Sequence, residues 1–334
     1  MNSSYLEIFK WQIKVDQEFL FYTCTCLIPL GICLNFIQFV FLFKKKFLHS
    51  TMGMYYRLIS VYNIFVLVLS WLYLISKSHS FNLNLINEIG CRLFSYFFRI
   101  TYQICSWLNV LVTFDRLVFI LFPTRFKILK NKAYIMGLFF SSHIFFILVN
   151  IPSLFFNFTS LSLNVSNVTY KCEQCWADHS IFLLRTITSQ IVGVYIPFFL
   201  MITLNSILFI KVFKSHHRLK HQIQMGKDIH FAFTLICSNI LFIILLTPYS
   251  IYIIILSTFM ESETLSLSLN VYLSLFETIT IAIYCINYSM SFIIQILFNK
   301  MFRKEVKMTI FKFLSILTGK QHIVHDSSTN HTLH

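Results

Sequence analysis

Seven long apolar runs constrain this chain more than any other feature of its sequence. A helix needs about 20 apolar residues to cross the hydrocarbon core of a membrane. Runs that meet this requirement cover residues 20–43, 54–76, 91–121, 133–156, 183–213, 229–257 and 267–298. The chain is 57% hydrophobic and 12% charged, about half the charged fraction of a soluble domain. The sequence therefore predicts an all-α, polytopic membrane protein whose seven spans form one domain.

The basic residues between the runs predict the orientation of the chain. They gather in segments 44–57, 125–132, 211–227 and 300–320, which share one side if the runs cross in order. Cytosolic loops of membrane proteins carry an excess of Lys and Arg. We therefore expect a plasma-membrane protein with an extracellular N-terminus and a cytoplasmic C-terminus. The net charge of +14 then reflects topology and contact with the lipid bilayer, and no nucleic acid is expected as a partner.

These expectations divide the chain into an extracellular N-terminus (1–19), a transmembrane domain (20–298) and a cytoplasmic part (299–334). In the last part, residues 298–314 mix bulky apolar side chains with lysines and an arginine. This pattern predicts a short amphipathic helix lying on the inner leaflet.

Sequons for N-glycosylation support the same orientation. Asn157, Asn164 and Asn167 each begin an Asn-x-Ser/Thr triplet after the fourth run, and Asn2 begins another near the N-terminus. All four asparagines would lie outside the cell, where glycosylation takes place.

The third run carries a cysteine near one end and an acid–base pair near the other. Cys91 and Arg116 lie about 37 Å apart on a helix that rises 1.5 Å per residue, so Asp115–Arg116 is expected at the cytosolic end. The alternative interpretation is a helix end whose charges reach lipid headgroups. In the oxidising extracellular space Cys91 could bond with Cys172 or Cys175, and the residues leave that choice open.

With these residues in place, the chain resembles the rhodopsin-like G-protein-coupled receptors over roughly residues 20–315. "DRL" at 115–117 stands for the family's Asp-Arg-Tyr, and Cys91 lies at the family's distance from the arginine. Further family positions are occupied by Asn35 in "CLNFIQFVF", Pro123 after the third span, Pro197 in "VYIPFF" and Pro248 in "FIILLTPYSIY". A looser similarity links the chain to invertebrate neuropeptide receptors.

The chain departs from the family pattern in spans two and seven. Ser291, Phe292 and Gln295 stand where the family has Asn, Pro and Tyr, and Asn63 replaces an aspartate. The family's sodium pocket would here be formed by uncharged groups, namely Asn63, Cys105, Asn287 and Ser291. We therefore expect weak sodium binding or none.

The resemblance implies a receptor that binds an extracellular ligand in the helix bundle and activates a heterotrimeric G protein. Asp115 would hold Arg116 in the resting state, and an opening of spans five and six would release it. The positions implied for ligand binding are Phe98, Arg99, Tyr102, Gln103, Gln190, Tyr249, Glu277 and Ile281. This aromatic and polar set favours a peptide ligand. The alternative is that Arg99 and Glu277, or Arg99 and Gln103, only satisfy each other.

Two other functions stay open. The non-standard residues of span seven are compatible with a chemosensory or decoy receptor that has lost coupling. A transporter or channel would need charges along the whole membrane path, and only Arg99 and Glu277 are found, both in the outer half. We expect no enzyme activity, cofactor or metal site, because no hydrolase, zinc or phosphate-binding motif is present.

Overall fold

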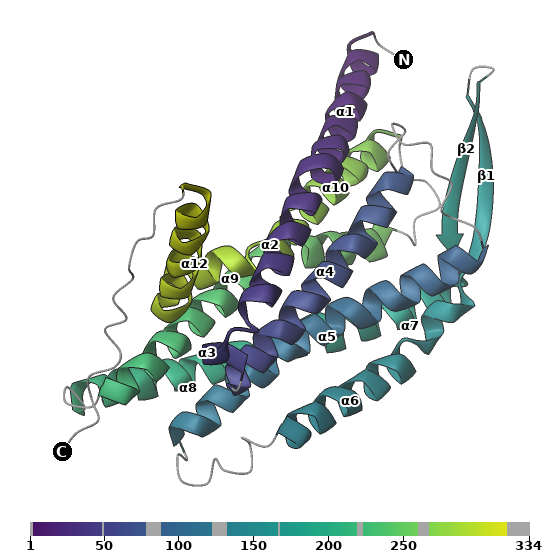
Figure 1. Ribbon diagram of the computed structural model, residues 1–334. Coiled ribbons are helices and arrows are strands. Elements are labelled where there is room, and N and C mark those ends of the chain that lie inside the picture. The colour runs from purple at the N-terminus through teal and green to yellow at the C-terminus, as the bar shows by residue number, and fades with distance from the viewer. Residues whose placement is uncertain are drawn as a thin grey trace, which may run out of the picture.

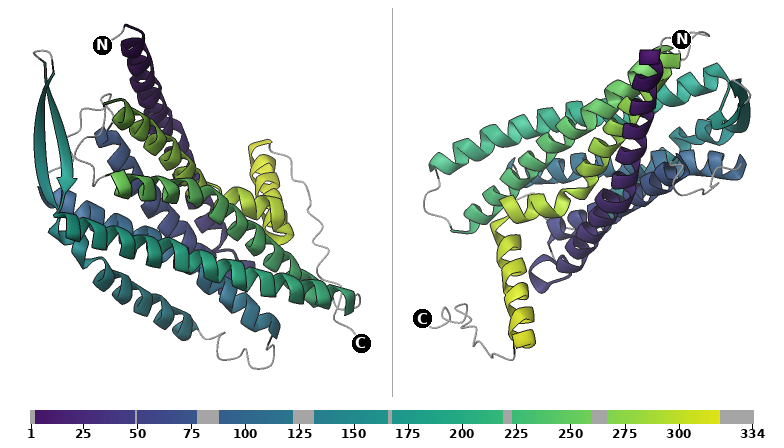
Figure 2. Two further views of the ribbon diagram at one scale, coloured as in Figure 1. Left: turned by 180° about the vertical axis from the view of Figure 1, so that it is seen from behind. Right: turned by 90° about the horizontal axis from the view of Figure 1, so that it is seen from above.

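The structure is a computed structural model that describes residues 3–48, 50–77, 88–121, 132–165, 168–218, 223–259 and 267–318. Long helices run side by side along one axis, and a β-hairpin extends from one end of the bundle (Figure 1). The C-terminal helix α12 lies across the bundle near the opposite end (Figure 2).

Helices make up almost the whole of the described chain. In chain order the elements are α1 (Ser3–Tyr22), η1 (Thr23–Leu27), α2 (Ile28–Phe41), α3 (Lys45–Leu48), α4 (Thr51–Lys77), α5 (Glu88–Leu121), α6 (Lys132–Val149), η3 (Ile151–Phe155), β1 (Asn157–Val165), β2 (Val168–Trp176), α7 (His179–Gln190), η4 (Ile191–Tyr195), α8 (Ile196–Arg218), α9 (Ile223–Phe259), α10 (Leu267–Ser289), α11 (Ser291–Phe298) and α12 (Lys300–Thr318).

The predicted seven-helix architecture is confirmed. Six helical stretches of the described residues are long and apolar enough to cross a membrane, and the pair Tyr272–Ser289 and Ser291–Phe298 forms a further span bent by 49°. No predicted run lacks its helix. The antiparallel hairpin of β1 and β2 is the only addition to the all-α plan within the described residues.

The first helix begins earlier than the sequence predicted. It runs from Ser3, and its membrane-length part starts at Trp11 rather than at residue 20. Polar residues interrupt the apolar pattern there, and two of them face protein. Gln12 and Asp16 are buried, and Ser274 Oγ of α10 donates to Asp16 Oδ2 over 3.3 Å. A helix that packs against a neighbour can therefore continue beyond its apolar run.

Proline accompanies three departures of the spans from α-helical geometry. The π-helical turns η1 and η4 lie directly before α2 and α8. Pro29 and Pro197 are the second residues of these two helices. A proline has no N–H to donate to the carbonyl four residues earlier, so the preceding turn widens. Pro152 lies in the 3₁₀ turn η3, and Pro248 lies inside α9.

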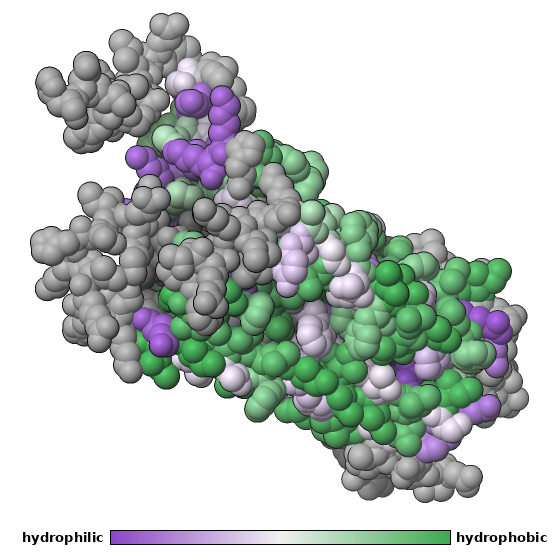
Figure 3. All heavy atoms as spheres, turned by 90° about the horizontal axis from the view of Figure 1, so that it is seen from below, coloured by the Kyte–Doolittle hydropathy of each residue, from purple (hydrophilic) through white to green (hydrophobic). Residues whose placement is uncertain are grey.

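The outside of the bundle is strongly apolar. Phe199 is 71% exposed and Ile144 is 61% exposed, and apolar side chains cover most of the described surface in Figure 3. A soluble monomer rarely exposes an apolar patch of this extent. This surface therefore faces the acyl chains of a lipid bilayer, and the protein is a multi-pass membrane protein.

Helices α2 and α10 approach each other closely at Gly31. A Cβ atom at this position would lie 2.0 Å from Ser289 Oγ and 2.8 Å from Ser289 Cβ. The absence of a side chain thus brings the first span against the end of α10, next to the bend before α11.

We expect Gly31→Ala to lower the free energy of unfolding by about 1–3 kcal/mol, because the added methyl group must push Ser289 away. Gly137→Ala in α6 is the matched control, since no atom lies within 4 Å of its Cβ position. That variant should match the wild type or gain about 0.5–1 kcal/mol from helix propensity. Thermal unfolding of the purified protein measures both, and equal Tm values would contradict the close approach.

Candidate functional site

Helices α5 and α7 meet at Ser189 in the half of the bundle that carries the β-hairpin, which is called the outer half below (Figure 1). Arg99 Nη1 donates to Ser189 Oγ over 2.7 Å, and the Tyr102 hydroxyl bonds the same oxygen. Gln103 Nε2 donates to it over 3.5 Å. Gly193 makes this approach possible, because a Cβ there would lie 2.8 Å from Gln103 Cγ. Three predicted ligand-binding residues thus share one serine.

Gln103 and Gln190 are buried in this region. Gln103 is fully buried and also accepts a hydrogen bond of 2.6 Å from Asn150 Nδ2, which ties α5 to the end of α6. Gln190 Oε1 accepts no hydrogen bond from the described residues. Gln103 is therefore committed to the protein, whereas Gln190 keeps a free acceptor.

Glu277 and Arg99 have different partners. Glu277 Oε1 accepts a 2.9 Å hydrogen bond from the hydroxyl of Tyr73, on α4. Among the described residues, no ion pair joins Glu277 to Arg99. The two charges of the predicted set are therefore held apart by separate tyrosine and serine contacts.

Aromatic rings pack against one another near these charges. Phe98 and Tyr284 have ring centroids 6.2 Å apart, and Tyr249 lies 5.1 Å from Tyr284. Ile281 belongs to the same apolar cluster, in which Phe98 and Tyr249 are half-buried. All eight predicted ligand-binding positions therefore lie on the outer halves of α5, α7, α9 and α10.

Asn35 is the hub of a second polar group, in the middle of the bundle. Its Nδ2 donates to the backbone oxygens of Gly31 and Tyr288, both over 2.8 Å. Its Oδ1 accepts from Asn63 Nδ2 over 3.0 Å, and Asn63 Oδ1 accepts from Cys105 Sγ over 3.0 Å. Four helices are linked through uncharged groups just before the bend of the last span.

Two other residues predicted for this place do not join the network. Asn287 Nδ2 is buried without a hydrogen-bond partner among the described residues. Ser291 begins α11, beyond the 49° bend. No proline lies at this bend. The residue between the two helices is Met290.

The Asp115–Arg116 pair is buried near the end of α5 that is remote from the β-hairpin, which is called the inner end below. Arg116 Nη2 lies 3.7 Å from Asp115 Oδ2. The side chain of Arg116 is 8% exposed and that of Asp115 is 3% exposed. Arg116 Nη2 also donates to Thr51 Oγ1 over 3.2 Å, and the guanidinium lies over the ring of Phe119. The pair is therefore enclosed by protein rather than extended to headgroups.

The carboxylate of Asp115 is poorly satisfied. Neither of its oxygens accepts a hydrogen bond from the described residues, so the neighbouring guanidinium supplies the compensation that the structure shows. A buried ion pair with incomplete hydrogen bonding contributes little net stability. Exposure of this end to water would therefore cost little.

Asn239 of α9 connects three spans one turn above this pair. Its Nδ2 donates to Thr113 Oγ1 of α5 over 2.7 Å and to Asn205 Oδ1 of α8 over 3.3 Å. Asn239 and Thr113 are fully buried. This triad holds the inner halves of the third, fifth and sixth spans together.

Sequence reasoning missed Ser189, Asn239 and Thr113. Serine and threonine in membrane helices commonly bond their own backbone, so their presence predicts no contact. The polar residues within "LICSNILF" could have indicated a contact for Asn239, because an amide without a partner in the hydrocarbon core costs free energy.

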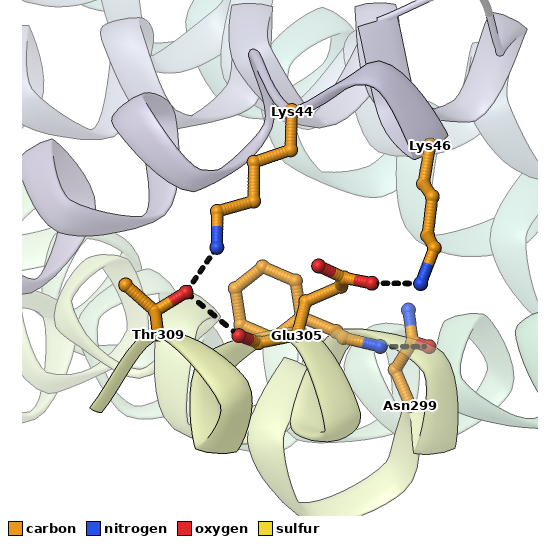
Figure 4. A network of polar contacts seen from close by, with 6 residues as sticks. Lys44, Lys46, Asn299, Glu305 and Thr309 are labelled. Carbon is orange, nitrogen blue, oxygen red and sulfur yellow. Dashed lines mark hydrogen bonds and ion pairs between the residues drawn. The ribbon is translucent and has the colours of Figure 1, made fainter. Parts of the chain in front are cut away.

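The last helix is fixed by a polar network that Figure 4 shows. Asn299 caps α12: its Oδ1 accepts the backbone N–H of Phe302 over 3.1 Å, and its Nδ2 donates to Gln295 Oε1 over 2.9 Å. Lys46 pairs with Glu305, and Lys44 donates to Thr309. The predicted amphipathic helix is thus present and attached to the first inner turn.

Several predicted sites lie outside the described part of the chain. These are Pro123, Asn2 and Asn167, together with the side chains of Cys91, Cys172, Cys175 and Asn164. Asn157 is described: its side chain is exposed and its Oδ1 accepts from Arg92 Nη2 over 2.8 Å.

We expect Asn35→Ala to lower the free energy of unfolding by about 1–3 kcal/mol, because it leaves the buried Asn63 amide and the Tyr288 carbonyl with fewer partners. The matched control is Asn287→Ala, whose side-chain nitrogen makes no hydrogen bond in the described residues. Thermal unfolding measures both variants. A Tm loss for Asn287→Ala as large as that for Asn35→Ala would argue against the hub.

The comparisons with known proteins agree with this arrangement. No curated protein matches the chain significantly. The model of the seven-transmembrane receptors of the rhodopsin family matches residues 34–288, which include Asn35, the buried Asp115–Arg116 pair and the Asn239 triad. The chain belongs to the rhodopsin family of seven-transmembrane receptors.

Proposed function

We propose that this receptor binds an extracellular peptide between the outer halves of its helices and activates a heterotrimeric G protein at its cytosolic end. The observation that carries the proposal is the buried Asp115–Arg116 pair, whose carboxylate lacks hydrogen bonds in the described residues. Separating such a pair costs little free energy. An exposed guanidinium can then donate to the carbonyls and carboxylates of a partner.

The orientation follows from charge. Basic residues of α12 and of the inner turns carry the Arg116 end of the bundle into the cytosol under the positive-inside rule. The sequon asparagines then lie outside, with the plasma membrane as the location. Asn157 of this set is solvent-exposed at the start of the hairpin.

The peptide proposal rests on the chemistry of the outer residues. A site with two polar poles, near Arg99 and near Glu277, suits a ligand that brings several hydrogen-bonding groups at once. Aromatic rings between the poles supply the apolar contact that peptide side chains need. A small amine would need a carboxylate at the third span, where Phe98 stands.

The activation step would separate α9 from α5 and α8. Any outward movement of the inner half of α9 must break the two hydrogen bonds of Asn239. We therefore assign to Asn239 the role of holding the resting arrangement, with Arg116 as the group that meets the G protein.

Arg116→Ala is expected to abolish G-protein activation, because the variant lacks the donor that meets the partner. The measurement is dissociation of each class of heterotrimer in transfected cells, with equal surface expression confirmed by labelling of the N-terminus. Arg57→Gln is the control, since Arg57 lies at the same end, where it donates to Leu48 O over 3.3 Å and stacks on Phe43. A wild type that activates no class of G protein in any ligand screen would favour the decoy receptor.

Asn239→Leu is expected to raise ligand-independent signalling several-fold, because it removes both bonds that hold α9. Thr247→Val is the matched control on the same helix, since the Thr247 hydroxyl donates within its own helix, to Ile243 O over 2.7 Å. The rise should disappear in Asn239→Leu/Arg116→Ala. Basal signalling that is unchanged in Asn239→Leu would exclude the proposed holding role.

A further inference from the structure

Arg185, a residue outside the predicted ligand set, lies beside Arg99 in the outer half of the bundle. It belongs to α7, one turn before Ser189, and it donates to Ser95, which lies one turn before Arg99 on α5. Arg99 in turn donates to Ser189, which Tyr102 also contacts, so the two like charges lie along the same contact of α5 with α7. Two guanidinium groups from different spans therefore share one apolar and aromatic environment.

Contacts with protein fix the position of Arg185 without neutralising it. Its guanidinium lies 3.6 Å from the ring centroid of Phe156 and 5.1 Å from that of Phe182. Its Nη1 donates to Ser95 Oγ over 3.3 Å, while its Nε is buried without a hydrogen-bond partner among the described residues. Stacking on aromatic faces orients a guanidinium and leaves its donors available.

Within the described residues, no ion pair joins either arginine to an acid. Arg99 has Ser189 as its partner, and Arg185 has Ser95. Glu277, whose carboxylate also acts on Tyr249, accepts a hydrogen bond from Tyr73 instead. A guanidinium has five N–H donors, so most donors of the pair have no partner among the described residues.

We propose that Arg99 and Arg185 together bind an anionic oxygen group of the ligand, namely a carboxylate, sulfate or phosphate. Adjacent like charges in a poorly solvated place are costly unless an anion joins them. An oxyanion can accept from both forks at once, which is the strongest form of charge-assisted hydrogen bond. The inference deepens the proposed function and rests on its placement of the ligand between the outer halves of the helices.

The test is oxyanion binding to the full-length purified receptor without G protein. The Tm is followed by tryptophan fluorescence during titration with succinate, sulfate or inorganic phosphate, each against chloride at the same ionic strength. A ligand that binds the folded state raises the Tm with its concentration. We expect at least one oxyanion to raise the Tm of the wild type beyond chloride.

The variants separate a built site from a general salt effect. Arg99→Gln/Arg185→Gln should weaken the apparent affinity by about tenfold or more, while Arg57→Gln removes one positive charge elsewhere and should leave it unchanged. A preference for succinate indicates a carboxylate ligand, and a preference for sulfate or phosphate indicates an ester of that acid.

Two results would overturn the proposal. One is the absence of any oxyanion effect beyond chloride in the wild type, and the other is an equal effect in the double glutamine variant. If that variant cannot be purified, Arg99→Lys and Arg185→Lys take its place, because lysine keeps the charge and loses the planar fork. Wild-type affinity in both lysine variants would then count against the proposal. Binding without any G-protein activation would contradict the proposed coupling alone.

Discussion

The constraint on which this structure depends is the lack of water in the hydrocarbon core, where each polar group must find its partner inside the protein. Asn35 meets this constraint by serving two backbone carbonyls and another amide. Asn239 meets it by joining two neighbouring spans. Because apolar packing between helices competes with equally apolar lipid, these amides specify which helices meet and in which register.

The same constraint explains where the molecule can change. Charged groups that are only partly satisfied are found at both ends of the bundle. At the inner end the carboxylate of Asp115 lacks hydrogen bonds in the described residues, and at the outer end the Nε of Arg185 lacks one. A partner bound at either end would supply the missing hydrogen bonds, so the two ends are suited to respond to molecules outside the bundle.

The sequence alone predicted the spans, the place of Asp115–Arg116 near the end of the third helix and the amphipathic helix, because these depend on length, periodicity and order along one helix. It did not predict Ser189 as the meeting point of α5 and α7, or Arg185 beside Arg99. Contacts of this kind depend on how each helix is rotated about its axis, and the π-helical turn before Pro197 changes that rotation. The early start of the first helix was missed for a related reason, since Asp16 is polar in sequence but covered by α10.

Glu305 is the one acid on the otherwise basic helix α12, and it is buried against Lys46. This contact, the Lys44–Thr309 contact and the fully buried ring of Phe302 lie on one face of the helix. Arg303, Lys304 and Lys307 are turned outward as a result, as are Ile310 and Phe311. The contacts of α12 with the turn after α2 thereby decide which of its side chains can reach lipid, and a change in that turn would alter them.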